Sequence, residues 1–251
     1  MKIIQYLEKI LAAVQYPGFL RAILRWRKFS FASFLIVSRL IKGGIEPGTV
    51  LDLGANIGQF AIASANLFGG STRIISFEPE PNTANILRKN VEGLPVEVME
   101  LALGSAPGES IFFVNADSQV SSLLPLGETR LTDFPESVIK HEIKVSIESL
   151  DNLFASNDLT SPILLKIDVQ GFESEVIAGA THFLNKVRWI VMEVSFTDLY
   201  KGEVDFISIL NLLSDRGFRF LRPLNMHFSP KTGEVIEMDA LFVNANENTD
   251  I

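Results

Sequence analysis

An acidic residue and two glycines follow a predicted strand at residues 50–60, Val-Leu-Asp-Leu-Gly-Ala-Asn-Ile-Gly-Gln-Phe. The strand ends near Leu53, the chain turns through Gly54 and Gly58, and a helix then begins. Glycines in such a turn allow a ligand close to the backbone, and the start of a helix offers unpaired N–H groups. Because open α/β folds bind ligands at this edge of the sheet, the segment predicts a nucleotide pocket.

The acid before the turn narrows the choice of nucleotide. A carboxylate at Asp52 repels a pyrophosphate and favours a ligand with a cationic part. The dinucleotide fingerprint Gly-x-Gly-x-x-Gly is also incomplete, because Asn56 stands at its second glycine. We expect Asp52, Gly54, Asn56 and Gly58 to contact the cofactor.

A second acid supports this interpretation. Residues 73–81, Arg-Ile-Ile-Ser-Phe-Glu-Pro-Glu-Pro, predict another strand, which ends at Glu78, 24 residues beyond Gly54. An acid at the end of the second strand can accept hydrogen bonds from ribose hydroxyls. The alternative for either motif alone is a strand end with a capping carboxylate, and the spacing of the two favours the nucleotide site.

These motifs, followed by Asn-Ile-Leu-Arg-Lys-Asn at 85–90 and Leu-Lys-Ile-Asp-Val-Gln-Gly-Phe-Glu at 165–173, resemble the FkbM family of S-adenosylmethionine-dependent methyltransferases. The resemblance covers roughly residues 48–244. The third block usually reads Asp-Val-Glu-Gly in that family, and Gln170 stands here in place of the acid.

The resemblance implies S-adenosylmethionine as cofactor. It assigns the methionine end of the cofactor to Asp52, Gly54 and Gly58, and the ribose to Glu78. The stretch from Ala102 to Gly104, after the third strand, is then expected to lie along the adenine.

Beyond residue 48, strands and helices alternate, which predicts an α/β fold with a doubly wound parallel sheet. We expect seven strands, near residues 49–53, 73–78, 95–101, 162–168, 188–194, 217–222 and 237–243. The last two are joined by a turn containing Pro230 and Gly233, so we expect them to be antiparallel. This order resembles the Rossmann-like class I methyltransferase fold, in which the last strand is reversed.

Two predicted strands bring carboxylates to the position expected for the reaction. Asp168 follows Lys166 at the end of the fourth strand, and Glu193 lies near the end of the fifth. Methyl transfer from a sulfonium is an in-line displacement, so the enzyme must align an acceptor and, for an alcohol, remove its proton. Asp168 is the leading candidate to hold or deprotonate a hydroxyl, with Glu193 and Lys166 as secondary candidates.

These acids have two alternative uses. Asp168 and Glu193 could bind Mg²⁺, although no third ligand is evident and we predict no metal site. Both could instead be structural and hydrogen-bond neighbouring loops. His141, near the end of an insertion, is a candidate general base, and the alternative is a solvated histidine on a strand edge.

The insertion covers about residues 110–147. Two strand-like runs, at 110–115 and 142–147, enclose a polar segment that contains Ser121, Ser122, Pro125, Gly127 and Pro135. An insertion before the fourth strand overhangs the ligand edge of the sheet. We expect a substrate-binding lid, with an edge hairpin and a loose loop as the alternative.

Charge is unevenly distributed between an N-terminal extension, residues 1–47, and the domain of residues 48–251. The overall net charge is −8, but residues 1–42 carry +7, which leaves −15 for the remainder. Apolar residues recur at helical spacing in the extension. It could be a basic amphipathic contact to an anionic membrane, a cover over the active site, or a helical cap packed on the domain.

Composition limits the class of protein. At 251 residues and 47% hydrophobic content, the chain can bury a sizeable core. The chain has no cysteine, which excludes disulfides and thiolate metal sites. With no signal peptide of normal form, we expect a cytoplasmic protein, with the inner membrane face as a peripheral alternative. The acidic domain disfavours nucleic-acid binding.

Three functions follow from these observations. The favoured one is S-adenosylmethionine-dependent O-methylation of a small-molecule or glycan hydroxyl, on a sugar or a secondary metabolite. A nicotinamide-dependent oxidoreductase is disfavoured by the missing Gly-x-Gly-x-x-Gly. The third is an inactive cofactor-binding module that serves as a membrane or complex subunit.

Overall fold

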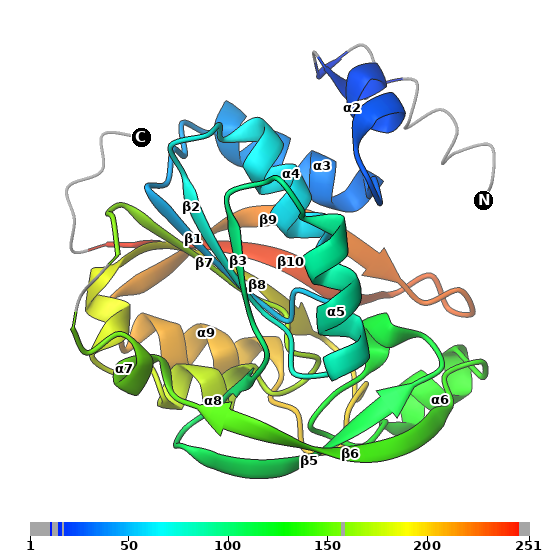
Figure 1. Cartoon of the computed structure of the whole chain (residues 1–251). Coiled ribbons are helices and arrows are strands. Elements are labelled where there is room, and N and C mark those ends of the chain that lie inside the picture. The colour runs from blue at the N-terminus through cyan, green and yellow to red at the C-terminus, as the bar shows by residue number, and fades with distance from the viewer. Residues whose placement is uncertain (1–10, 12–14, 17, 157–158, 246–251) are drawn as a thin grey trace.

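A computed structural model describes residue 11 and residues 15–16, 18–156 and 159–245. Its main element is a seven-stranded sheet (Figure 1). In spatial order the strands are β3 (Val96–Met99), β2 (Arg73–Phe77), β1 (Thr49–Leu53), β7 (Ile163–Ile167), β8 (Val187–Ser195), β10 (Val235–Asn244) and β9 (Phe218–Phe228). β10 is antiparallel to both of its neighbours, and the other pairings are parallel. The predicted class I methyltransferase fold is confirmed.

The strand order creates the ligand crevice. From β1 the chain proceeds outward through β2 and β3 in one direction, and then from β7 through β8 in the other. The connections that follow β1 and β7 therefore diverge, which opens a crevice at their carboxyl ends. Asp52 on β1 is the register partner of Lys166 on β7, so these two side chains meet at the base of the crevice.

The edge strand β9 is longer than the sequence indicates. The prediction for this strand ended at 222, before Pro223, whereas β9 continues to Phe228. Pro223 is tolerated because β9 is the edge strand and its pairing with β10 is irregular beside Ala240. His227 lies in this continuation of β9, beyond the predicted end of the strand.

Helices cover both faces of the sheet (Figure 1). One face packs against α3 (Phe31–Lys42), α4 (Gln59–Leu67) and α5 (Pro81–Asn90). The other packs against α7 (Leu150–Leu153), α8 (Glu173–Ala178), the short 3-10 helix η2 (Phe183–Lys186) and α9 (Phe206–Ser214). α5 begins sharply because the Glu80 carboxylate accepts the N–H groups of Asn82 and Thr83.

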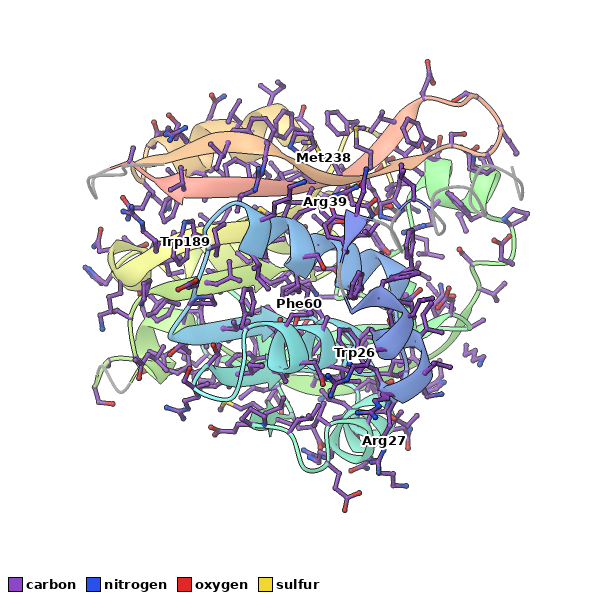
Figure 2. All side chains as sticks on the ribbon, turned by 90° about the horizontal axis from the view of Figure 1, so that it is seen from above. Trp26, Arg27, Arg39, Phe60, Trp189 and Met238 are labelled. Carbon is purple, nitrogen blue, oxygen red and sulfur yellow. The ribbon has the colours of Figure 1, made fainter. Side chains whose placement is uncertain are left out.

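The N-terminal extension is a helical cap on the sheet. α3 packs on α4 and β9, with Phe34, Val37 and Leu40 buried. The shorter α2 (Phe19–Arg25) reaches this cluster through Phe19 and Ala22. Figure 2 shows the extension from above, with Trp26 and Phe60 labelled, which pack in the same apolar cluster. The first predicted helix, before residue 15, lies almost wholly outside the described residues.

Two polar contacts complete the cap. The Arg39 guanidinium donates to the Leu224 carbonyl on β9, and Arg27 donates to the Lys89 carbonyl on α5 at 2.8 Å. Arg27 also lies 3.5 Å from the Glu92 carboxylate. Among the described residues, no helix has both the length and the apolar character required to cross a bilayer.

The two strands of the insertion, together with a short strand that precedes it, form a second, three-stranded sheet beside the large one (Figure 1). Its order is β4 (Ala102–Leu103), β6 (Ile139–Glu148) and β5 (Gly108–Asn115). The segment between β5 and β6 contains a 3-10 helix, η1 (Ser118–Val120), and α6 (Glu128–Asp133). The segment is therefore more ordered than a loose loop.

We predict that Phe34→Ala strongly destabilises the protein. Phe34 is fully buried, and its ring contacts those of Tyr16, Phe19, Trp26 and Phe29. Truncating a buried phenylalanine leaves a cavity and costs about 3–5 kcal/mol. The free energy of unfolding in urea, measured by circular dichroism, tests this. Leu24→Ala is the control, because Leu24 is 84% exposed on the same extension and should change stability by less than about 0.5 kcal/mol.

Candidate active site

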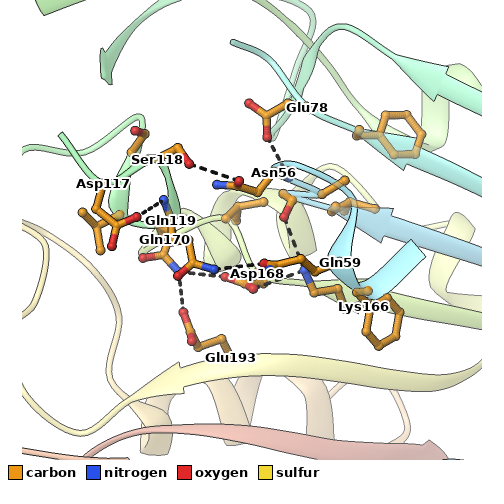
Figure 3. A pocket seen from close by; sticks show the side chains of 18 of the residues that line it. Asn56, Gln59, Glu78, Asp117, Ser118, Gln119, Lys166, Asp168, Gln170 and Glu193 are labelled. Carbon is orange, nitrogen blue, oxygen red and sulfur yellow. Dashed lines mark hydrogen bonds and ion pairs between the residues drawn. The ribbon is translucent and has the colours of Figure 1, made fainter. Parts of the chain in front are cut away.

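A cavity of about 390 Å³ lies at the carboxyl edge of the large sheet. Its walls come from the ends of β1, β2, β7, β8, β9 and β10, from the insertion and from the start of α3. Figure 3 shows its polar side chains, which converge from these separate elements. The cavity has an end beside β1 and β2, and another beside β8, β9 and β10.

Glu78 dominates the end beside β1 and β2. One carboxylate oxygen accepts the Asn56 N–H at 2.9 Å and the other accepts the Glu80 N–H at 3.0 Å. Asn56 adopts a left-handed conformation with φ of 48°, which asparagine tolerates better than most residues, so the turn points its N–H at Glu78. Burial raises the pKa of Glu78 to about 7. Each oxygen retains a lone pair for a ligand.

Apolar side chains flank Glu78. Phe77, Leu101, Ala102 and Leu103 line the cavity beside it. Ala102, which the family resemblance assigns to the adenine, thus lies at the cavity wall.

Lys166 connects the two central strands below the cavity. Its ammonium lies 3.2 Å from an Asp52 oxygen and 3.1 Å from an Asp168 oxygen, and it donates to the Gly54 carbonyl at 3.3 Å. Burial alone lowers the pKa of Lys166, but the two carboxylates outweigh this and raise it above its usual value. The lysine is therefore a cation, and a structural one.

Glycine is required at position 54 because the backbone of Asp168 lies too close for any side chain. The φ of Gly54 is 72°, and a Cβ there would lie 1.7 Å from the Asp168 carbonyl oxygen. The turn after β1 can therefore contact the end of β7 only because the residue has no side chain.

Asp168 and Glu193 face each other at the second end of the cavity (Figure 3). The Gln170 amide nitrogen donates to Asp168 at 2.7 Å and to Glu193 at 2.5 Å. Burial would raise the pKa of Asp168, but the Lys166 ammonium and the Gln170 amide hold it below its usual value. Burial and the nearby Asp168 charge raise the pKa of Glu193 well above its usual value. The pair thus combines a carboxyl group whose neighbours favour the ionised form, Asp168, with one whose burial favours the protonated form, Glu193.

The structure does not bring every candidate residue to the cavity wall. Gly54, Asn56, Glu78, Ala102, Lys166, Asp168 and Glu193 line it. Asp52 is fully buried below it, paired with Lys166. Gly58 lies against α5, because a Cβ there would meet the Leu87 side chain at 2.5 Å. His141 is exposed on β6 and is not among the residues of the wall.

Glu173 orders the loop that carries Asp168. It is buried at the start of α8, and one carboxylate oxygen accepts the N–H groups of Val169 at 3.0 Å and Gly171 at 3.3 Å. Burial raises its pKa to about 8.

Sequence reasoning missed several polar residues at the second end. They are Arg130 of α6, His227 of β9, and Glu237 and Asp239 of β10. Burial raises the pKa of Glu237 to about 7 and that of Asp239 to about 6, and it lowers the pKa of His227. A signal was present: in a reversed strand the first residues lie at the ligand edge, and residues 237 and 239 share one face.

The insertion contacts the sheet edge across the cavity. Ser118 donates to the Asn56 side chain at 3.1 Å, and the Gln119 amide donates to Gln59 at 3.1 Å (Figure 3). Residues 117–121 and Leu123 also line the cavity. The insertion thus forms a wall of the site.

The start of α3 forms part of the opposite wall. Ser30, Ser33 and Ile36 all line the cavity, although they belong to the N-terminal extension. The helical cap on the sheet therefore also reaches the cavity.

Within the described ranges, no group of three or more histidine, cysteine or acidic side chains is arranged to hold a metal ion. The described residues therefore provide no third ligand for a Mg²⁺ ion at Asp168 and Glu193. Glu193 instead shares a hydrogen-bond donor with Asp168.

Comparison with known proteins gives consistent matches. Residues 52–220 match the family model described as methyltransferase FkbM domain. The chain is 31% identical over 171 residues to 2-O-methyltransferase NoeI of Sinorhizobium fredii, covering 65% of this chain and 70% of NoeI. It is 27% identical over 161 residues to hexuronic acid methyltransferase AglP of Haloferax volcanii, covering 63% of this chain and 61% of AglP.

A solved structure shows a distant likeness. The FkbM methyltransferase of Methylobacillus flagellatus matches with a TM-score of 0.48 and 14% identity, over 79% of this chain and 44% of that protein. This chain therefore spans less than half of the crystallised protein. The family match covers most of this chain and includes Gly54, Glu78 and Asp168. The chain belongs to the FkbM family of S-adenosylmethionine-dependent methyltransferases.

Proposed function

We propose that this protein transfers the methyl group of S-adenosylmethionine to a hydroxyl of a sugar, glycan or secondary metabolite. The observation that carries the proposal is the single cavity that joins Glu78 at one end to Asp168 and Glu193 at the other. The first end suits a nucleoside, and the second suits a hydroxyl. The names of the relatives support an oxygen acceptor, since NoeI is a 2-O-methyltransferase and AglP a hexuronic acid methyltransferase.

The residues present fit the cofactor. Both Glu78 oxygens are held by backbone N–H groups and retain lone pairs for the ribose hydroxyls. Phe77, Leu101 and Leu103 offer apolar surface to the adenine. The carboxylates that line the cavity suit the positive sulfonium and ammonium groups. When bound, the cofactor supplies a methyl group activated on sulfur.

Asp168 is proposed to hold the acceptor hydroxyl and to accept its proton as the oxygen attacks. Its pKa is held low by Lys166 and Gln170, so it is an ionised acceptor of hydrogen bonds at neutral pH. Its main contribution is then alignment of the hydroxyl for in-line attack. Burial and the Asp168 charge raise the pKa of Glu193, and in its protonated form Glu193 can donate to a second oxygen of the acceptor. His141 lies outside the cavity wall, and we assign it no part in this step.

The insertion and α3 are proposed to limit the access of water to this step. Ser118, Gln119 and Ser33 bring polar side chains to the wall from the two segments. Excluding water strengthens electrostatic interactions inside a site and prevents hydrolysis.

The N-terminal extension is further proposed to contact an anionic membrane surface. On α2, Leu20 is 64% exposed and Leu24 is 84% exposed, next to Arg21 and Arg25. Exposed leucines beside arginines are typical of segments that lie in the interface of an anionic bilayer. The positive charge of residues 1–42, on an otherwise acidic chain, also favours contact between the extension and an anionic membrane.

We predict that Glu78→Ala weakens S-adenosylmethionine binding at least about tenfold, because hydrogen bonds to a charged group contribute about 1.5–3 kcal/mol. Isothermal titration calorimetry with S-adenosylmethionine and S-adenosylhomocysteine measures this. Glu97→Gln, a half-exposed glutamate of β3, is the control and should bind normally. Equal affinity of Glu78→Ala and the wild type would contradict the ribose assignment.

We predict that Asp168→Asn lowers kcat at least about 10²-fold, within the range typical of general base catalysis. Cofactor affinity should change by less than about threefold, since Asp168 is assigned to the acceptor. S-adenosylhomocysteine release, measured by mass spectrometry on a panel of sugars and polyketide alcohols, provides the assay. Glu142→Gln, a change at an exposed glutamate of β6, is the control. Unchanged turnover in Asp168→Asn would refute the assignment.

We predict that the protein co-floats with vesicles containing phosphatidylglycerol and much less with neutral phosphatidylcholine vesicles. Substituting Leu20→Ser together with Leu24→Ser should reduce flotation several-fold. Ile86→Ser, an exposed isoleucine on α5, is the matched control. Equal flotation of the wild type and the double variant would show that this face of α2 does not contact lipid.

A further inference from the structure

Gln170 occupies a constrained backbone position directly after Asp168. Its φ is 58°, and the following Gly171 has a φ of 96°, so two successive residues are left-handed. The Ser122 hydroxyl of the insertion donates to the Gln170 carbonyl at 2.5 Å. A non-glycine residue in this region is uncommon and costs conformational energy, so surrounding contacts must hold it.

The side chain of Gln170 uses its whole amide (Figure 3). The nitrogen donates one hydrogen to Asp168 at 2.7 Å and the other to Glu193 at 2.5 Å. The oxygen accepts a hydrogen bond from the Tyr200 hydroxyl. Because a carboxylate can only accept, the amide cannot be turned over without losing the contact to Asp168.

A chain of polar contacts continues from this amide into the insertion. Tyr200 is 1% exposed, and the Arg130 guanidinium of α6 donates to its hydroxyl at 3.3 Å. Arg130 lies 3.6 Å from the Glu237 carboxylate. The amide therefore connects the two acids of the reaction site to α6 of the insertion.

The charges around Asp168 and Glu193 explain what a hydrogen-bond donor at residue 170 contributes to these two acids. The charged and titratable groups that face the two acids come from several neighbouring elements, and four of the eight are carboxyl groups: Lys166, Asp52, Glu173, Glu237, Asp239, His227, Tyr200 and Arg130. Like charges disfavour ionisation, and N–H donors favour it. A glutamate at 170 would remove both donors and add a third acid.

We propose that Gln170 is a positioning residue. Its amide holds the Asp168 and Glu193 side chains in the positions that the acceptor hydroxyl requires, and Gln170 links both acids to the insertion. This inference depends on the proposed methyl transfer only for what the arrangement of the two acids is used for. The arrangement itself is a property of the free protein. Either an alanine or a glutamate at 170 would remove it.

The test is a carboxyl ¹³C NMR titration of the ligand-free full chain, labelled at aspartate and glutamate. Asp168→Asn and Glu193→Gln identify the two resonances. Gln170→Glu keeps the size of the side chain, and its loss of donors should raise the apparent pKa of the acid pair by about one unit or more. Gln170→Gly should raise it less, because no charge is added, and glycine accepts the left-handed backbone without strain.

Gln119→Ala is the matched control. Gln119 is another amide that lines the cavity, but it bonds Gln59 and not the two acids, so its removal should leave their titration unchanged. Thermal unfolding of each variant confirms that it folds. An unchanged or lowered apparent pKa in folded Gln170→Glu and Gln170→Gly would overturn the proposal, as would an equal rise in Gln119→Ala.

The titration needs neither cofactor nor acceptor. A protein that methylates nothing would still give a readable result, so failure of this inference and failure of the proposed function are distinguishable. Once an acceptor is known, Gln170→Gly should lower kcat while calorimetric affinity for S-adenosylmethionine stays within about threefold of wild type. Loss of cofactor affinity in that variant would instead assign Gln170 to the cofactor and overturn the proposal.

Discussion

The ammonium of Lys166, held between Asp52 and Asp168, is the interaction on which the site depends. The three residues belong to β1, to β7 and to the loop that follows β7, so one cation joins the two strands between which the crevice opens. Breaking a buried ion pair by removing one partner typically costs about 3–5 kcal/mol, because a charge is left without a partner. The same contact keeps Asp168 ionised. Lys166 therefore contributes both to the pairing of β1 with β7 and to the ionised state of Asp168.

Three layers of structure surround this contact. The sheet supplies Glu78, Asp168 and Glu193 at strand ends, where backbone geometry is well defined. The insertion adds a wall and reaches the sheet through side-chain hydrogen bonds at Asn56 and Gln170. The start of α3 adds a wall from the other side. Under the proposed function, an acceptor must therefore fit a space shaped by the insertion and the start of α3 as well as by the sheet.

The sequence predicted the sheet well because its strands are short apolar runs separated by helices, and their order determines where the carboxyl ends meet. Glu78 and Asp168 were identified because each directly follows such a run. The prediction was less complete on β9 and β10, where Pro223 hid the continuation of an edge strand that carries His227. Arg130 could not be placed, since its position depends on tertiary packing against Tyr200 rather than on any local pattern. Asp52 and Gly58 show the converse: these two motif residues lie outside the cavity wall, one paired with Lys166 and the other packed against α5.

The close approach at Gly54 has a consequence for how freely this sequence can vary. A single methyl group there would overlap the Asp168 carbonyl oxygen, and backbone atoms have little freedom to move aside. Relief would require β1 and β7 to separate at their carboxyl ends, and Lys166 would then no longer reach both of its partners. Alanine, ordinarily among the mildest of replacements, would at this position damage folding and chemistry together. Side chains in the cavity wall can be replaced to suit a different acceptor. At position 54, by contrast, the fold accepts no residue other than glycine.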